Sequence, residues 1–159
     1  MVPGERAGTG GGGAMTGGEL WQRRALHALG KASEVGSVDL ALYSSYVERL
    51  GPAVLANGLG QALATEHSAG GEGGRNDKGR KLHDRLVQAL ESWLCQEVLE
   101  CGAEPSEPAY VLERLCQASQ ATYVRAQQEA LEWLEWHKRL VKARELALAA
   151  SAPSEEASP

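Results

Sequence analysis

The 159-residue chain contains no phenylalanine and no isoleucine, and its large aromatic residues are four tryptophans and four tyrosines. Leucine, alanine, valine and tryptophan must therefore build any hydrophobic core. Alanine, leucine, glutamate, glutamine and arginine are abundant while β-branched runs are missing, and this composition favours helix over strand. Since no stretch shows sustained strand-type alternation, the sequence predicts an all-α fold.

Long apolar runs are also missing. No window approaches the roughly 18 consecutive apolar residues of a membrane span, and the glycine-rich beginning lacks the apolar segment of a signal peptide. We therefore expect a cytoplasmic protein that does not bind membranes. We further expect a disordered tail over residues 1–15, a single α-helical domain over residues 16–150, and a disordered polar tail over residues 151–159.

Cysteine is scarce, and its spacing is unlike that of a metal site. The three cysteines are Cys95, Cys101 and Cys116, an odd number without a CxxC pair. A separation of six residues places Cys95 and Cys101 on different faces of a helix. We expect three buried, reduced thiols and no metal ion or other cofactor.

The chain also lacks the common signatures of catalysis. None of its four histidines lies in an HExxH motif, and "GGRNDKGRK" lacks the Lys-Ser/Thr pair of a phosphate-binding loop. No nucleophile has a base that the sequence places beside it. We predict a protein that is not an enzyme, and a stand-alone helical ribonuclease is the catalytic alternative.

Helical periodicity divides the chain into about six helices with short loops, which is typical of a compact bundle. Thr16 and Glu19 have the spacing of a capping box that begins the first helix, and Gly36 is expected to end it in a left-handed cap. Pro52 is expected to begin the third helix. The predicted helices cover residues 16–36, 39–50, 52–68, 78–101, 108–118 and 119–150.

Two glycines inside the predicted third helix oppose its helical propensity. Gly58 and Gly60 each cost about 1 kcal/mol relative to alanine in a helix interior. A bend, or the close approach of a neighbouring helix, would explain them.

The last helix has one broad apolar face. Trp133 lies in the middle of this face, and we predict that it is a core residue. Trp136 lies at its edge and is expected to be half-exposed, at an interface with a partner. His137 falls within the apolar arc, and we expect a hydrogen-bonded, partly buried histidine.

The formal net charge of −5 argues against a uniformly basic nucleic-acid-binding protein, but the basic residues are clustered. One candidate RNA- or subunit-binding group lies on the outer face of the last helix: Lys138, Arg139 and Lys142. A second candidate group lies on the first helix: Arg23, Arg24 and Lys31. The spacing of the first group leaves two interpretations, a solvated face partly neutralised by Glu135 or a strip that binds phosphates.

Two segments together resemble a known family. "YSSYVERLGPAVLANGLGQALA", Tyr43 to Ala64, is similar to the Y…L-P-x-x-I-x-x-N-G-L-x-x-x-L-A segment of the Cmr small subunit of type III-B CRISPR effector complexes. "YVRAQQEALEWLEWHKRLVKA", Tyr123 to Ala143, resembles the second signature of that family, Y-x-x-x-x-x-E-A-L-x-x-L-x-W-x-K-R. The residues that carry the likeness are Asn57, Gly58, Leu59, Glu129, Ala130, Leu131, Trp136, Lys138 and Arg139.

The resemblance implies a structural subunit of an RNA-targeting ribonucleoprotein in antiviral defence. Such small subunits stack head-to-tail beside larger RNA-binding subunits, along the duplex of guide RNA and target RNA, and another subunit cuts the target. The expected partners are other Cmr-type subunits, including the backbone and large subunits, guide RNA, target RNA and further copies of the chain. A helical adaptor that binds another protein without nucleic acid is the alternative.

Overall fold

The computed structural model describes residues 17–71, 77–101 and 109–153, and all regular structure in these ranges is helical. The predicted all-α fold is therefore confirmed. Thr16, where the predicted capping box begins, lies outside the described residues. Pro108, at the start of the predicted fifth helix, lies outside them as well. The elements are α1 (Gly17–Ser33), the 3-10 helix η1 (Ser37–Asp39), α2 (Leu40–Asn57), α3 (Leu59–Gly71), α4 (Asp77–Leu94), the π-helical turn η2 (Cys95–Leu99), α5 (Tyr110–Gln117) and α6 (Gln120–Ser151).

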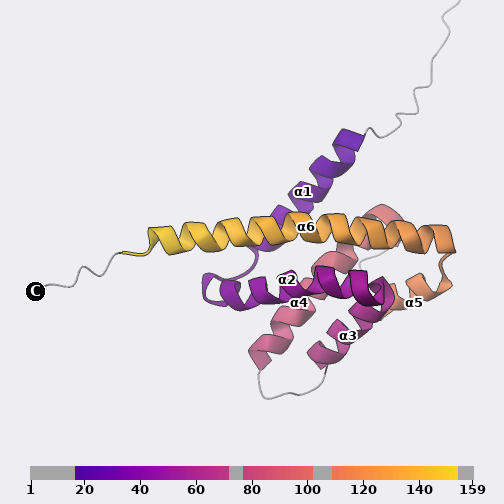
Figure 1. Ribbon diagram of the computed structural model, residues 1–159, viewed down its shortest axis with the longest axis horizontal. Coiled ribbons are helices and arrows are strands. Elements are labelled where there is room, and N and C mark those ends of the chain that lie inside the picture. Colours follow the sequence, from indigo (N-terminus) through magenta and orange to yellow (C-terminus); the bar gives the residue numbers. More distant parts are fainter. Residues whose placement is uncertain (1–16, 72–76, 102–108, 154–159) are drawn as a thin grey trace, which may run out of the picture.

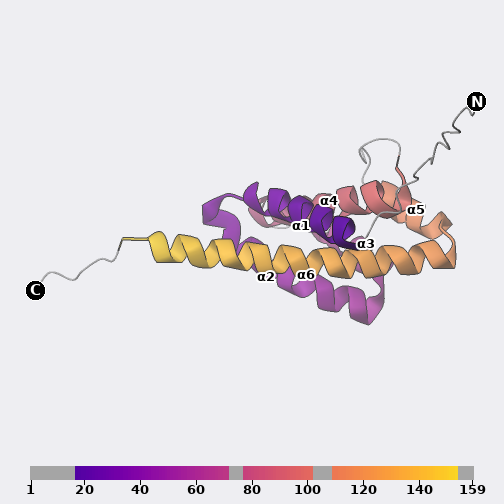
Figure 2. The ribbon, with the colours of Figure 1, turned by 90° about the horizontal axis from the view of Figure 1, so that it is seen from above.

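Helix α6 is the longest element and runs along the length of the molecule (Figures 1 and 2). Its 32 residues correspond to about 48 Å of helix. Helices α1 and α2 make the most extensive contacts with α6, while α3 and α4 pack against each other. No helix in the described ranges combines the length and the apolar character required to span a bilayer.

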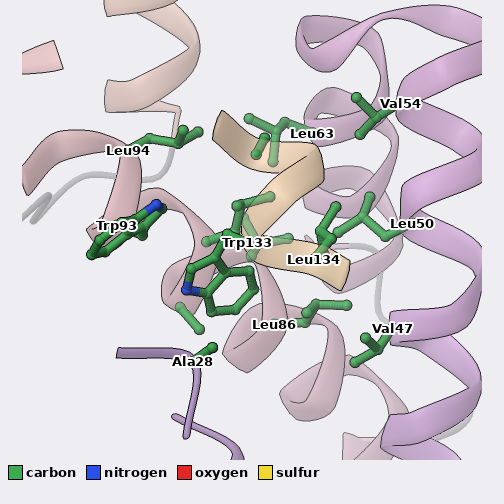
Figure 3. Close-up of a cluster of buried hydrophobic side chains, with 14 of the residues drawn as sticks. Ala28, Val47, Leu50, Val54, Leu63, Leu86, Trp93, Leu94, Trp133 and Leu134 are labelled. Atoms are coloured by element: carbon green, nitrogen blue, oxygen red, sulfur yellow. The ribbon is translucent and has the colours of Figure 1, made fainter. Parts of the chain in front are cut away.

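All six α-helices contribute to one cluster of buried hydrophobic side chains. Figure 3 shows Trp133 of α6 beside Ala28 of α1, with Trp93 of α4 on the same side, while Leu134 lies toward Leu50. Trp93 and Trp133 are the largest fully buried side chains, so Trp133 is a core residue, as predicted. Each buries on the order of 200 Å², which stabilises the fold by several kcal/mol before conformational entropy is subtracted.

The predicted helix break at Pro52 is wrong. Helix α2 continues through Pro52 to Asn57. Leu50 and Val54 on either side of the proline are both fully buried, whereas Pro52 is exposed. Burial of the flanking residues offsets the loss of one helical hydrogen bond at the proline, so the helix continues.

The chain bends instead at Gly58, which has a φ of +83°. The next two backbone N–H groups begin α3 and have no partner within that helix. Side chains of α6 supply the acceptors, because Leu59 N donates to Gln127 Oε1 at 3.0 Å and Gly60 N donates to Tyr123 Oη at 3.0 Å. The bend and the close approach of a neighbouring helix are both present, as the glycine pattern indicated.

The predicted left-handed cap at Gly36 is also wrong. Gly36 has a φ of −62°, and α1 has already ended at Ser33. Arg144 of α6 binds the backbone beyond this end, donating to Ala32 O at 2.7 Å and to Val35 O at 2.5 Å. A guanidinium from α6 therefore binds two backbone carbonyls near the end of α1.

The expectation of three buried, reduced cysteines is not met. Cys95 and Cys101 form a disulfide with a Cα–Cα distance of 4.8 Å, and Cys116 is exposed on α5. In a regular α-helix, a separation of six residues would place the two side chains on different faces. Here η2 is a wider π-turn, and Glu100 after it has a φ of +49°. The chain reverses there, and the two cysteines meet.

Gly58→Ala is expected to lower the free energy of unfolding by about 1–3 kcal/mol, because L-residues rarely adopt this backbone conformation. The added Cβ would also lie 3.3 Å from Tyr123 Oη. Gly30→Ala is the matched control, since nothing lies within 4 Å of its added Cβ, and it should stabilise by about 0.5–1 kcal/mol. Urea unfolding of both variants tests this, and equal effects would contradict the role assigned to Gly58.

Candidate functional site

Arg24, one of the predicted binding residues, forms a buried ion pair between α1 and α6. Its Nε donates to Glu129 Oε1 at 2.6 Å and its Nη2 donates to Glu129 Oε2 at 2.9 Å. Arg24 and Glu129 are both only 9% exposed. The hydrogen bonds from Arg24 to Glu129 raise the pKa of the guanidinium further above its ordinary value. Arg24 therefore holds two helices together and presents little surface to a partner.

Glu129 also accepts a hydrogen bond from α4. The indole Nε1 of Trp93 donates to Glu129 Oε1 at 2.9 Å. One carboxylate thus joins α1, α4 and α6 in the interior. In the sequence, Glu129 stood out only as part of the E-A-L signature. Its pairing with Arg24 could not be predicted from residue spacing, because 105 residues separate the two.

The other two basic residues of α1 also have carboxylate partners. Arg23 binds Glu97 of η2 through two hydrogen bonds, of 3.0 and 2.7 Å. These bonds hold the pKa of Glu97 below its usual value. Lys31 pairs with Glu34 at 3.4 Å and lines a surface hollow between α1 and α4.

Three of the basic residues of α6, those of the first candidate group, pair with carboxylates of their own helix. Lys138 Nζ lies 2.7 Å from Glu135 Oε1, and Arg139 Nε lies 3.6 Å from Glu135 Oε2. Lys142 Nζ lies 3.1 Å from Glu145 Oε2. The side chains of Lys138, Arg139 and Lys142 are 43%, 72% and 50% exposed. We call these three residues the α6 strip.

Trp136 stacks on an aromatic partner from α1. The ring centroids of Trp136 and Trp21 are 5.9 Å apart, and their planes differ by 13°. Trp136 is partly buried against the core, whereas Trp21 remains 45% exposed. The two indoles form an aromatic surface at the junction of α1 and α6. Trp136 belongs to the same helix as the α6 strip.

His137 is fully buried and is hydrogen-bonded through both ring nitrogens. Its Nδ1 lies 3.0 Å from the carbonyl of Ala28, which can only accept, so Nδ1 carries the proton. Its Nε2 lies 2.7 Å from Tyr43 Oη and therefore accepts the phenolic proton. Burial lowers the pKa of His137 to about 4 and raises the pKa of Tyr43. This neutral pair connects α1, α2 and α6 within the core.

The described residues contain no group of three or more histidine, cysteine, aspartate or glutamate side chains placed to hold a metal ion. Their polar groups form ion pairs and hydrogen bonds, some between helices and some within one helix. The described surface that is open to a partner includes the α6 strip, the stacked indoles and hollows between the helices.

Glu129→Gln should lower the free energy of unfolding by about 3–5 kcal/mol, because it leaves the buried guanidinium of Arg24 without its counter-charge. Glu132→Gln is the control, since Glu132 lies 3.9 Å from the same guanidinium but has a 65% exposed side chain. Removing this exposed charge should cost no more than about 1 kcal/mol. Urea unfolding measures the loss of stability in both variants. Similar losses would contradict the structural role assigned to the buried pair of Arg24 and Glu129.

Lower pH is expected to destabilise the fold through His137. Its pKa of about 4 in the folded chain lies below the ordinary 6.5, so the unfolded chain binds more protons between these values and stability falls as the pH falls. The decrease between about pH 7.5 and pH 5 should be about 2 kcal/mol. Urea unfolding at both pH values measures it, and His137→Gln should show a correspondingly smaller pH dependence. An identical pH dependence in both proteins would refute this assignment.

Comparison with known families identifies a relationship over most of the chain. A family model described as CRISPR-associated protein (Cas_Cmr5) matches residues 20–144. The matched range begins in α1, includes both family-like segments and extends into the last turns of α6. No curated protein matches the sequence.

Proposed function

The chain belongs to the Cmr5 family of CRISPR-associated proteins, and from this premise we propose that it is a non-catalytic structural subunit of a type III-B effector ribonucleoprotein in the cytoplasm. Family membership implies association with other subunits of the Cmr complex. In our proposal, copies of the chain stack beside the backbone subunits and support the duplex of guide RNA and target RNA. Base pairing selects the target, so this subunit needs to contact only phosphates and the shape of the duplex.

The observation that supports RNA contact is that each cation of the α6 strip pairs with a carboxylate only three or four residues away on the same helix. Exposed pairs at i,i+3 and i,i+4 contribute only about 0.3–0.5 kcal/mol each. An RNA phosphate can therefore replace Glu135 or Glu145 at little cost. The pair of Arg24 and Glu129 is different, because it is buried and breaking it is expensive. We therefore assign RNA contact to Lys138, Arg139 and Lys142, and a structural role to Arg24.

We assign Arg23 and Lys31 to contacts with a neighbouring subunit rather than with the duplex. Both have acidic partners, Glu97 and Glu34. The surface beside Lys31 also includes Asp84, so it is mixed in charge. A mixed surface suits a protein partner with complementary charges better than a continuous polyanion.

A helical adaptor that binds only protein is a second candidate function, and one observation favours it. Trp21 and Trp136 form a partly exposed aromatic pair, and tryptophan is enriched where protein interfaces are strongest. Under this alternative, changes in the α6 strip would not alter RNA binding by the assembled complex.

Charge reversal of the α6 strip should weaken capture of target RNA by the assembled complex. For Lys138→Glu with Arg139→Glu, we expect lower affinity and a weaker salt dependence. In a plot of the logarithm of the binding constant against the logarithm of the salt concentration, the slope should be smaller by about 1 for each phosphate that the variant no longer neutralises. Filter binding of labelled target RNA over a series of salt concentrations measures both quantities.

The matched control is Arg80→Glu with Lys81→Glu on α4. These two residues pair with Asp77 at i,i+3 and i,i+4, the same local geometry as in the α6 strip. The control should bind RNA with an affinity closer to that of the unmodified complex. If both double variants bind RNA as the unmodified complex does at every salt concentration, RNA contact by the α6 strip is excluded.

A further inference from the structure

A disulfide closes the turn that follows α4. Cys95 and Cys101 lie at the two ends of this turn, and the backbone N–H of Cys101 also donates to Cys95 O at 3.2 Å. We call residues 95–101 the η2 turn. Its backbone is unfavourable by itself, because η2 is π-helical and Glu100 is a non-glycine residue with a φ of +49°. The sulfur–sulfur bond therefore holds a turn that local backbone preferences do not select.

The η2 turn connects three helices. The carboxylate of Glu97 binds Arg23 of α1 through two hydrogen bonds, of 3.0 and 2.7 Å. The carbonyl of Glu97 accepts a hydrogen bond of 3.1 Å from Arg125 of α6. The carbonyl of Leu99 accepts one of 2.8 Å from Arg114 of α5. A change in the conformation of this turn is therefore transmitted to α1, α5 and α6.

The two cysteines differ in their access to solvent. Cys95 is 5% exposed, whereas Cys101 at the end of the turn is only partly buried. A dissolved thiol or peroxide therefore reaches Cys101 first. The proposed function places the chain in the cytoplasm, where thiol reductants keep most cysteines reduced, and disulfides that form there are usually transient ones in catalysis or redox sensing.

We propose that the disulfide between Cys95 and Cys101 is a reversible redox switch that sets how firmly the η2 turn holds α1, α5 and α6. The inference rests on the proposed function for the compartment and for the role of Arg23 in contact with a neighbouring subunit. In the oxidised state the turn is fixed, and Glu97 keeps its bonds to Arg23. In the reduced state the turn relaxes, and Arg23 is held less firmly.

Reduction is a thiol–disulfide exchange with a dithiol. A thiolate of the reductant attacks Cys101 Sγ, the sulfur–sulfur bond breaks, and Cys95 leaves as a thiolate that takes a proton from water. The second thiol of the reductant, as a thiolate, then displaces Cys101 from the mixed disulfide. The dithiol supplies two electrons and becomes a disulfide, and the chain gains two thiols.

Oxidation in the opposite direction uses a peroxide. The Cys101 thiolate attacks one oxygen of hydrogen peroxide, the O–O bond breaks, and the products are a sulfenic acid and hydroxide. The Cys95 thiolate then attacks the sulfenic sulfur, the S–O bond breaks, and a second hydroxide leaves. The two protons lost by the thiols convert both hydroxides into water, so two thiols and one peroxide give one disulfide and two waters.

Hydrogen–deuterium exchange of the full-length chain tests the switch. One sample is divided and treated with hydrogen peroxide or with dithiothreitol, and alkylation followed by mass spectrometry counts the free thiols. We expect one free thiol, that of Cys116, after peroxide and three after dithiothreitol. Amides of the η2 turn, α5 and the first turns of α6 should exchange about tenfold faster in the reduced form. Amides of α2 should exchange at the same rate in both forms.

Thermal unfolding gives a second measurement on the same two samples. The reduced form should melt about 5–10 °C below the oxidised form. Cys101→Ser cannot form the disulfide, so it should behave as the reduced chain after either treatment. Cys116→Ser is the matched control, since Cys116 is an exposed thiol outside the disulfide, and it should keep the full difference between the two treatments.

Three results would each overturn the proposal. Peroxide could leave all three thiols free, dithiothreitol could leave the disulfide intact in the folded chain, or the η2 turn could exchange equally fast in both forms. These comparisons use the unmodified chain, so they remain decisive even if Cys101→Ser does not fold. RNA capture by the α6-strip variants is measured separately, and failure of the switch leaves the proposed function to its own test.

Discussion

The carboxylate of Glu129 is the interaction on which the arrangement of α1, α4 and α6 depends. It accepts two hydrogen bonds from Arg24 and one from Trp93, all within the interior. A buried charge of this kind is tolerated only when its geometry and hydrogen bonding are nearly complete. The same two helices, α1 and α6, also bring Trp21 onto Trp136. The E-A-L element of the family-like signature is thus explained by packing.

The basic residues divide into two groups by the sequence separation of their ion-pair partners. Some pair with a carboxylate on another helix and hold the fold together, and others pair within one helix and remain at the surface. Arg24 reaches a carboxylate on another helix, and burial makes this pair essential to the fold. Among the residues that the structure describes, Lys138, Arg139 and Lys142 pair with Glu135 and Glu145 of their own helix, where solvent weakens each pair. A net acidic chain can therefore still carry an exposed basic strip, because each of these pairs is local and weak.

The sequence predicted features that depend on local pattern and volume. Trp133 was correctly assigned to the core, and Gly58 and Gly60 correctly indicated a bend at a close helix contact. The boundary at Pro52 was wrong, since the burial of Leu50 and Val54 outweighs a local helix-breaking tendency. The disulfide between Cys95 and Cys101 was missed, because a regular α-helical period does not anticipate a π-turn. Arg24 and Arg144 were assigned no structural role, since their partners lie more than a hundred residues away in the chain.

By itself the sequence determined that this chain is helical, that tryptophan and leucine build its core, and that it resembles the Cmr small subunits, because composition, periodicity and short signatures are properties of neighbouring residues. Only the tertiary structure decided which cations are bound inside the fold and which remain at the surface. It also brought Gly51 and Pro52 of α2 beside Leu134 of α6, where they line a hollow between these two helices. The physical reason is that Coulomb and packing energies depend on distance in space. Helical periodicity places residues on the faces of one helix, but it does not specify which faces of different helices meet.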